Sequence, residues 1–160
     1  MVAGFGNVLR SDDGFGPAVA RYLEATSPPP AVLVLEIGIG GIHLVQELLD
    51  PASVLVIVDA VNLDRTPGTV VVLEPEVADL TGLSVMDRRD QLADMHYATP
   101  ERALLLAGAM GVLPATTWLV GCEPVDADEP GIGLSPAVEQ AVAVAAAEVR
   151  RLLADAGFSW

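Results

Sequence analysis

Short runs of branched apolar residues recur along the chain and predict buried β-strands. The runs are nearly continuous rather than alternating, which is typical of strands that are covered by helices on both faces of a sheet. A first short strand ends just before Asn7, and four more are expected at 32–35, 54–58, 70–73 and 118–120. Residues 64–68 read as the loop before a strand that pairs antiparallel at an edge of the sheet.

Helical patterns alternate with these runs. Prolines in the first turn and glycines before an amphipathic stripe mark the starts of the helices. We expect helices from Pro17 to Ala25, from after Gly41 to Leu49, from Pro100 through Met110, and from Pro136 through Leu152. The alternation predicts a single α/β domain over residues 1–160, a three-layer sandwich whose mostly parallel, twisted sheet is flanked by helices. Residues 79–94 are polar and are expected to form a loop or a short helix over one edge of the sheet.

Composition restricts the possible partners. The 160 residues carry 22 acids against eight arginines, with no lysine, for a net charge of −14. A field of this sign repels nucleic acid and anionic membrane surfaces, whereas a basic protein partner is compatible with it. The chain has neither an uninterrupted apolar stretch long enough for a membrane span nor the pattern of a secretory signal. The single cysteine, Cys122, cannot form an internal disulfide, and we expect a reducing, cytoplasmic location.

Polar residues that follow the predicted strands are the candidates for chemistry, because ligands of open α/β sheets bind at the carboxyl ends of the strands. They are residues 7–13, Glu36, Asp59 and Glu123. Asp13 and Asp59 are expected to face each other across one crevice. Neighbouring carboxylates repel, which raises one pKa unless a cation lies between them. For the adjacent Asp12, a capping role is the favoured interpretation.

His96 is the third candidate, on a loop just ahead of the helix that starts at Pro100. Two carboxylates and one imidazole suit a borderline divalent metal such as Ni²⁺ or Zn²⁺. A structural histidine is the competing interpretation, and the spacing matches no local metal motif. His43, at the start of the second helix, is a weaker candidate for a ligand. Cys122 ends an apolar strand and is expected to be a buried, unreactive thiol.

Three other enzyme classes fit the sequence less well. The opening Gly4-Phe5-Gly6 has two glycines of a dinucleotide-binding turn, but Leu9 replaces the third glycine and the following acids would repel a pyrophosphate. No G-x-S-x-G motif indicates a serine hydrolase. A peptidyl-tRNA hydrolase also opens with a G-x-G-N turn, but this chain lacks a basic surface and a histidine soon after that turn.

The segment from Gly4 to Gly16 resembles the G-x-G-N-x-L-x-x-D-[DE]-x-x-G opening of the [NiFe]-hydrogenase maturation endopeptidases. Essentially the whole chain takes part in the resemblance, and several motifs in one order are far more specific than any single motif. The other matching parts are Val58-Asp59-Ala60, Pro67-Gly68-Thr69, His96 ahead of a leucine-rich helix, and the closing segments 119–124 and 133–138.

The resemblance implies an endopeptidase that removes the C-terminal peptide from the hydrogenase large-subunit precursor after nickel insertion. By position in the motifs, Asp13, Asp59 and His96 would bind nickel that the precursor supplies, and other divalent metals could substitute. The family is usually classed as aspartic-type, and either Asp13 or Asp59 would be the general base. A second hypothesis is a non-catalytic module or chaperone that recognises nickel with the same residues.

Glycines in the turn after the second strand are candidates for substrate binding. Gly38, Gly40 and Gly41 leave room for an extended peptide backbone, although tight-turn geometry explains them equally well.

The sequence departs from the family at three points. The chain starts three residues before Gly4, which makes the first strand short; Glu36-Ile37-Gly38 stands where the family has an acid and two glycines; and Asp13 is one methylene shorter than the glutamate of some relatives.

Overall fold

The computed structural model describes residues 1–78, 80, 86 and 99–160. The strands in this part of the chain form one sheet in the order β2-β1-β3-β5-β4. β1 pairs in parallel with β2 and β3, and β3 pairs in parallel with β5, whereas β4 lies antiparallel to β5 at the edge. The mostly parallel sheet and its antiparallel edge strand are therefore confirmed. The strands are β1 (Val2–Phe5), β2 (Val34–Gly38), β3 (Val54–Ala60), β4 (Val70–Leu73) and β5 (Thr116–Cys122).

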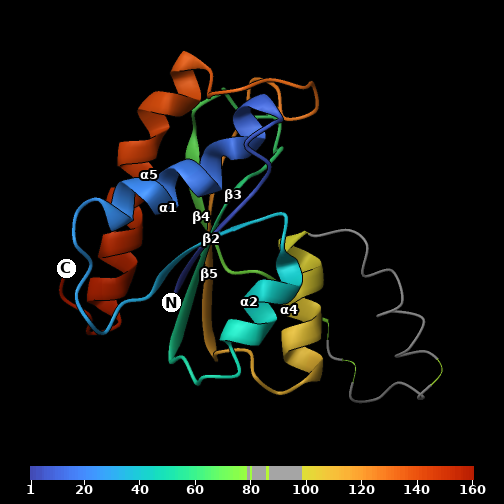
Figure 1. The fold of residues 1–160 in the computed structure, drawn as a ribbon, viewed down its shortest axis with the longest axis vertical. Helices are drawn as coiled ribbons and strands as arrows, with labels where there is room; N and C mark the ends of the chain where they lie inside the picture. Colours follow the sequence, from blue (N-terminus) through green and yellow to red (C-terminus); the bar gives the residue numbers. More distant parts are fainter. Residues whose placement is uncertain (79, 81–85, 87–98) are drawn as a thin grey trace.

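Helices cover both faces of the sheet, so the three-layer prediction is also confirmed (Figure 1). α1 and α5 lie together on one side, and α2 and α4 pack against each other on the other side. Prolines occupy the first turns of α4 and α5, as their sequence pattern indicated. The helices are α1 (Phe15–Glu24), α2 (Gly41–Glu47), α4 (Pro100–Ala109) and α5 (Pro136–Asp155), and a 3-10 turn, η1 (Ser11–Gly14), precedes α1.

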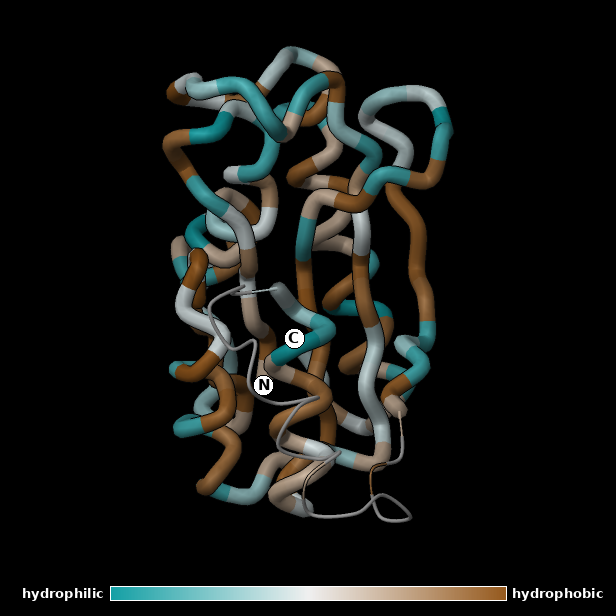
Figure 2. The backbone as a smooth tube through the Cα atoms, turned by 90° about the vertical axis from the view of Figure 1, so that its right-hand side faces the viewer, coloured by the Kyte–Doolittle hydropathy of each residue, from teal (hydrophilic) through white to brown (hydrophobic). Residues whose placement is uncertain are grey.

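The central strand β3 shows why its apolar run is continuous. Its even-numbered valines, such as Val56 and Val58, are fully buried in the core under α1 and α5. Leu55 and Ile57 point the other way and are fully buried in the core under α2 and α4. A strand with two buried faces has no polar side to alternate with. In Figure 2 much of the strand backbone is accordingly brown, whereas teal segments are frequent in the loops at the upper end.

The boundaries of three strands differ from the prediction, and β5 extends beyond the expected 118–120 at both ends, from Thr116 to Cys122. β2 begins at Val34, because the Val32 N–H is used in a turn to the Pro29 carbonyl, and it continues through Glu36 to Gly38. Glu36 therefore lies within a strand rather than after it, where it is exposed and pairs with Arg21 at 3.3 Å. β3 likewise continues past Val58 and includes Asp59, which is paired in register with Gly121 of β5.

The predicted loop or short helix at 79–94 lies almost entirely outside the described residues. Among residues that the structure does describe, no helix combines the length and hydrophobicity that crossing a bilayer requires.

Close packing of α1 against the sheet depends on glycine. A Cβ at Gly16, in the first turn of α1, would overlap the carbonyl oxygens of Phe5 and Val58. A Cβ at Gly4 of β1 would in turn overlap the Gly16 carbonyl. The backbone of α1 therefore touches the backbones of β1 and β3 directly. This contact fixes the start of α1 at the carboxyl ends of both strands.

Replacing Gly16 by alanine tests this contact. We expect Gly16→Ala to lower the free energy of unfolding by about 2–4 kcal/mol, because strand and helix backbones would have to separate. Gly108→Ala in α4 is the matched control, since its Cβ would meet Val77 and Leu113 only at ordinary contact distances of 3.5 and 4.0 Å. That control should be neutral or slightly stabilising. Denaturant unfolding gives the free energy of unfolding of both variants, and equal values would contradict the expected effect of Gly16→Ala.

Candidate active site

The site lies where the chain changes direction across the sheet. From β1 the chain passes through α1 to β2 on one side, and from β2 it returns through α2 to β3 on the other side of β1. α1 and α2 cover opposite faces of the sheet (Figure 1). The carboxyl ends of β1 and β3 therefore form the switch point at which open α/β sheets bind ligands. Asp13 and Asp59 belong to the segments that meet there.

The turn after β1 brings Asp13 back toward the sheet. Gly6 has a φ of +124°, and a Cβ at this position would overlap the Asp13 carbonyl oxygen, so glycine is required on both grounds. The Gly6 N–H donates to the Gly38 carbonyl at 3.0 Å, which ties this turn to the end of β2. The Asn7 N–H donates to Oδ2 of Asp13 at 2.9 Å and orients that carboxylate.

Asp13 and Asp59 interact electrostatically, as the sequence predicted. Burial, together with the negative charge of Asp13, raises the pKa of Asp59 to about 8, although the Ala60 N–H, 3.0 Å from Oδ1, opposes the shift. Burial also raises the pKa of Asp13, against the hydrogen bond from Asn7. The structure therefore brings the two carboxylates together in a partly desolvated place.

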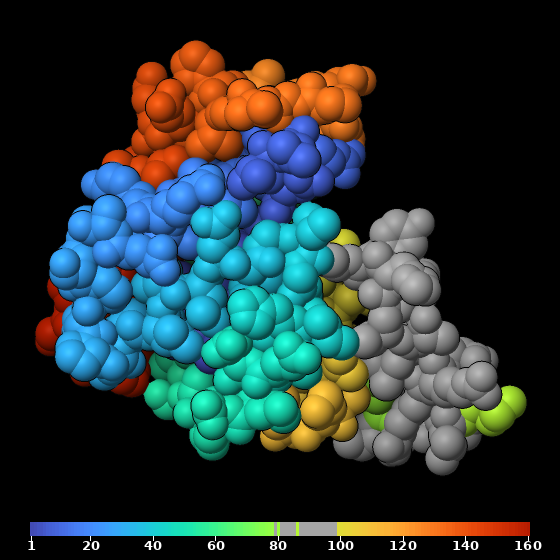
Figure 3. Space-filling model, viewed as in Figure 1, coloured from blue at the N-terminus to red at the C-terminus, as the bar shows by residue number. Residues whose placement is uncertain are grey.

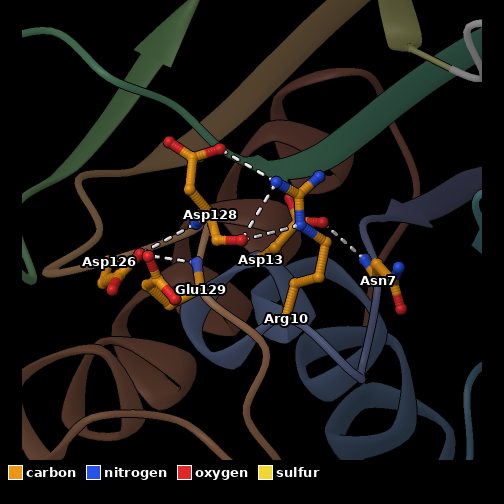
Figure 4. A network of polar contacts seen from close by, with 6 residues as sticks. All are labelled: Asn7, Arg10, Asp13, Asp126, Asp128 and Glu129. Atoms are coloured by element: carbon orange, nitrogen blue, oxygen red, sulfur yellow. Dashed lines mark hydrogen bonds and ion pairs between the residues drawn. The ribbon is translucent and has the colours of Figure 1, made fainter.

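Three further charged residues act on this pair: Glu101 and Asp128, which the sequence analysis did not single out, and Arg10, which belongs to the candidate stretch 7–13. Glu101, in the first turn of α4, adds to the rise in the pKa of Asp59. Arg10 lowers the pKa of Asp13, whereas Asp128 raises it. Arg10 pairs with Asp128 at 2.9 Å across the site, as Figure 4 shows. The start of α4 at Thr99-Pro100 was the sequence feature that could have identified Glu101.

Asp12 serves as a structural anchor rather than as part of the pair. It is fully buried and accepts hydrogen bonds from the N–H groups of Val125 at 2.9 Å and Ser135 at 2.6 Å, and from the Ser135 hydroxyl at 2.9 Å. Ser135 immediately precedes α5, so Asp12 anchors the start of a helix that is distant in sequence. The loop after β1 is thereby fastened to the loop after β5. The expected capping role at the entrance of its own helix is wrong, because neither η1 nor α1 has a side-chain cap.

A pocket of about 420 Å³ lies next to the end of β3. Glu123 on its wall is buried and accepts the Leu63 N–H at 2.8 Å, which holds the loop after β3 in place. The other lining residues are Ala60, Asn62, Pro124, Val125, Asp126, Ala127 and Asp128. The pocket therefore extends the candidate site along the ends of β3 and β5, with an acidic lining.

Other candidates from the sequence have different outcomes. His96 lies outside the described residues, so its role as a ligand stays a prediction. His43 is on the surface of α2, 3.2 Å from Glu47. Cys122 is fully buried, and burial raises the pKa of its thiol to about 11, which confirms the expectation of an unreactive thiol. In the part of the chain that the structure describes, no three His, Cys, Asp or Glu side chains gather to hold a metal ion.

The glycine turn after β2 lies beside the turn that follows β1. Gly38 has a φ of +60° and its carbonyl accepts the Gly6 N–H. Gly40 precedes α2, and Gly41 is the buried first residue of that helix. The positive φ of Gly38 supports the tight-turn explanation, while a role in substrate binding stays a prediction.

Hydrogenase maturation peptidases are among the solved structures with the same fold. The chain is 36% identical to a hydrogenase 2 maturation peptidase from a Thaumarchaeota archaeon, with a TM-score of 0.68 and 95% of each chain covered. It is 28% identical to the hydrogenase maturating endopeptidase HybD from E. coli, with a TM-score of 0.76 over 99% of this chain and 93% of that one.

Sequence comparison agrees with these structures. The hydrogenase expression/formation protein HupD of Rhodobacter capsulatus is 34% identical over 155 residues, which are 96% of this chain and 70% of HupD. The family model for hydrogenase maturation proteases matches residues 17–151, a span that contains Asp59 and begins just beyond Asp13. The chain therefore belongs to the hydrogenase maturation protease family, and is a hydrolase of peptide bonds.

Proposed function

We propose that this protein cleaves the C-terminal peptide from the large-subunit precursor of a [NiFe]-hydrogenase once nickel has been inserted. Nickel is then part of the substrate, and Asp13, Asp59 and His96 recognise it. The observation that carries this proposal is the pair of carboxylates at the switch point. They lie close enough for the charge of Asp13 to raise the pKa of Asp59.

The chemistry of the pair fits a divalent cation. Two partly desolvated carboxylates repel each other, and a cation between them removes that repulsion. With an imidazole from His96, the oxygen and nitrogen donors suit a borderline metal such as Ni²⁺, and other divalent ions can take its place. His96 precedes Thr99 by three residues, and the helix that begins after Thr99 carries Glu101, whose charge acts on Asp59.

The chain's own residues orient the reaction. A bound divalent metal polarises the scissile carbonyl and activates a water. One of the two aspartates takes the proton from that water as general base, which gives the reaction its aspartic-type character. The Asn7 N–H holds Asp13, and the Ala60 N–H holds Asp59, so that neither carboxylate rotates freely.

The glycine turn at Gly38, Gly40 and Gly41 is proposed to receive the substrate backbone. The Gly38 carbonyl accepts a hydrogen bond from the turn that positions Asp13. A peptide placed along the glycine turn would therefore pass the carboxylate pair. Gly38 and Gly40 are half-buried and carry no side chain, which leaves room for a peptide backbone beside them, whereas Gly41 is buried.

Substitution of the proposed ligands tests the function. We expect Asp13→Ala, Asp59→Ala and His96→Ala each to abolish trimming of nickel-loaded precursor while the fold is kept, because each removes a ligand or the general base. Mass spectrometry of the precursor before and after incubation gives the readout. His43→Ala is the matched control and should trim like the wild type, since His43 pairs with Glu47 on the surface.

Two outcomes would contradict the proposal. Full activity in any one ligand variant would remove that residue from the site. Wild-type protein that binds nickel-loaded precursor but leaves its mass unchanged would favour the non-catalytic recognition module instead. Nickel-free precursor should remain untrimmed in every case.

The carboxylate pair also predicts a pH dependence of stability. Since the folded-state pKa of Asp59 is about 8, against 3.8 as its ordinary value, the folded protein holds a proton that the unfolded chain releases. The stability contributed by protonated Asp59 is therefore complete below pH 3.8 and lost as pH rises toward 8. Asp59→Asn removes this loss.

We expect the melting temperature of Asp59→Asn to exceed that of the wild type by a margin that grows by several degrees between about pH 5 and pH 8, with a chelator present. Asp50→Asn removes the same charge from an exposed position after α2, and it controls for the change in net charge. Scanning calorimetry over this range gives the comparison. A margin that is constant or shrinks with pH contradicts the buried pair.

A further inference from the structure

Large apolar side chains are exposed in the loops that follow the parallel strands. Single exposed apolar residues are ordinary, but a group of them at one end of a protein marks an interaction surface. Leu9 after β1 is 62% exposed, Ile39 after β2 is 64% exposed and Ile132 after β5 is 90% exposed. We call this group, together with Ile42 in the first turn of α2, the apolar rim; its members are Leu9, Ile39, Ile42, Leu63, Val125 and Ile132.

Backbone hydrogen bonds hold the parts of the apolar rim beside one another. The Gly131 N–H donates to the Leu9 carbonyl at 3.0 Å, which places Ile132 next to the loop of Leu9. The bond from Gly6 to Gly38 joins that loop to the turn that carries Ile39. Figure 3 shows the orange segment around Ile132 resting on the dark-blue loop after β1, above the cyan turn after β2. Leu9, Ile39 and Ile132 therefore lie on adjacent, hydrogen-bonded loops at the end of the sheet that carries the carboxylate pair.

Acidic residues border the apolar rim. Asp128, which pairs with Arg10, and Glu129 are exposed on the segment between Val125 and Ile132. The chain as a whole carries a net charge of −14. A partner that covers this surface therefore needs an apolar centre with basic residues at its edge.

We infer that the apolar rim docks the folded body of the precursor, as distinct from the peptide that is cut. This inference rests on the proposed function, because the scissile bond must reach Asp13 and Asp59, and the protein to which it is attached must then lie against the surrounding loops. A peptide chain passing through the crevice leaves the outer side chains, such as Ile132, in water. A folded protein buries them, and hydrophobic contact then supplies binding energy.

Neutral polar substitutions test the docking surface without adding charge near the carboxylates. We expect Leu9→Gln and Ile132→Gln each to raise KM for nickel-loaded precursor by about ten-fold, with kcat unchanged, because they remove binding that ground state and transition state share. Leu49→Gln is the matched control. Leu49 follows α2 at the opposite end of the sheet, is 57% exposed, and should leave KM unchanged.

Binding of the precursor by each variant, measured by calorimetric titration, separates this inference from the proposed function. If the wild type binds the precursor without trimming it, the proposed function fails, and the dissociation constants alone decide on the docking surface. The inference is overturned if Leu9→Gln and Ile132→Gln bind as tightly as Leu49→Gln, or if the wild type does not bind the precursor. Should Leu9→Gln lose its fold, Ile132→Gln decides alone, since its side chain has almost no contacts to lose.

Discussion

The direct contact between the backbone of α1 and the backbones of β1 and β3 sets the rest of the structure. Gly16 permits this contact, and the short turn η1 immediately before α1 carries Asp13. Asp59 lies at the end of β3, the strand that Gly16 touches through the Val58 carbonyl. One side chain at Gly16 would push the helix, and Asp13 with it, away from Asp59. The spacing of the two carboxylates is thus a result of packing rather than of any attraction between them.

The two apolar cores hold together a pair that opposes folding. Repulsion and desolvation both act against the ionised form of Asp59. β3 offsets this, because its valines are buried on one face while Leu55 and Ile57 are buried on the other. A locally unfavourable pair of charges within an otherwise stable fold is typical of functional sites.

The sequence predicts the layers better than the ends of the elements. Buried runs such as 54–58 are typical of strands covered on both faces, and the position of Asp13 and Asp59 just after strands predicted that they would lie at the same edge of the sheet. The prediction that Glu36 follows the second strand was wrong because β2 is an edge strand. A polar residue can be exposed within such a strand, and Glu36 pairs there with Arg21. Arg10 and Asp128 form an ion pair although they are 118 residues apart in the sequence. The periodicity of apolar and polar residues carries no signal of such a contact. The role of His96 stays a prediction.

The buried carboxylate of Asp12 makes one unit of two loops that are far apart in the chain. Its partners, Val125 and Ser135, lie 113 and 123 residues away, and both of its oxygens are engaged. An insertion or deletion in either loop would pull a charge away from its donors inside the protein, at a cost of several kcal/mol. Redesign of this enzyme toward another hydrogenase therefore has to treat the two loops as a matched set, exchanged together or not at all.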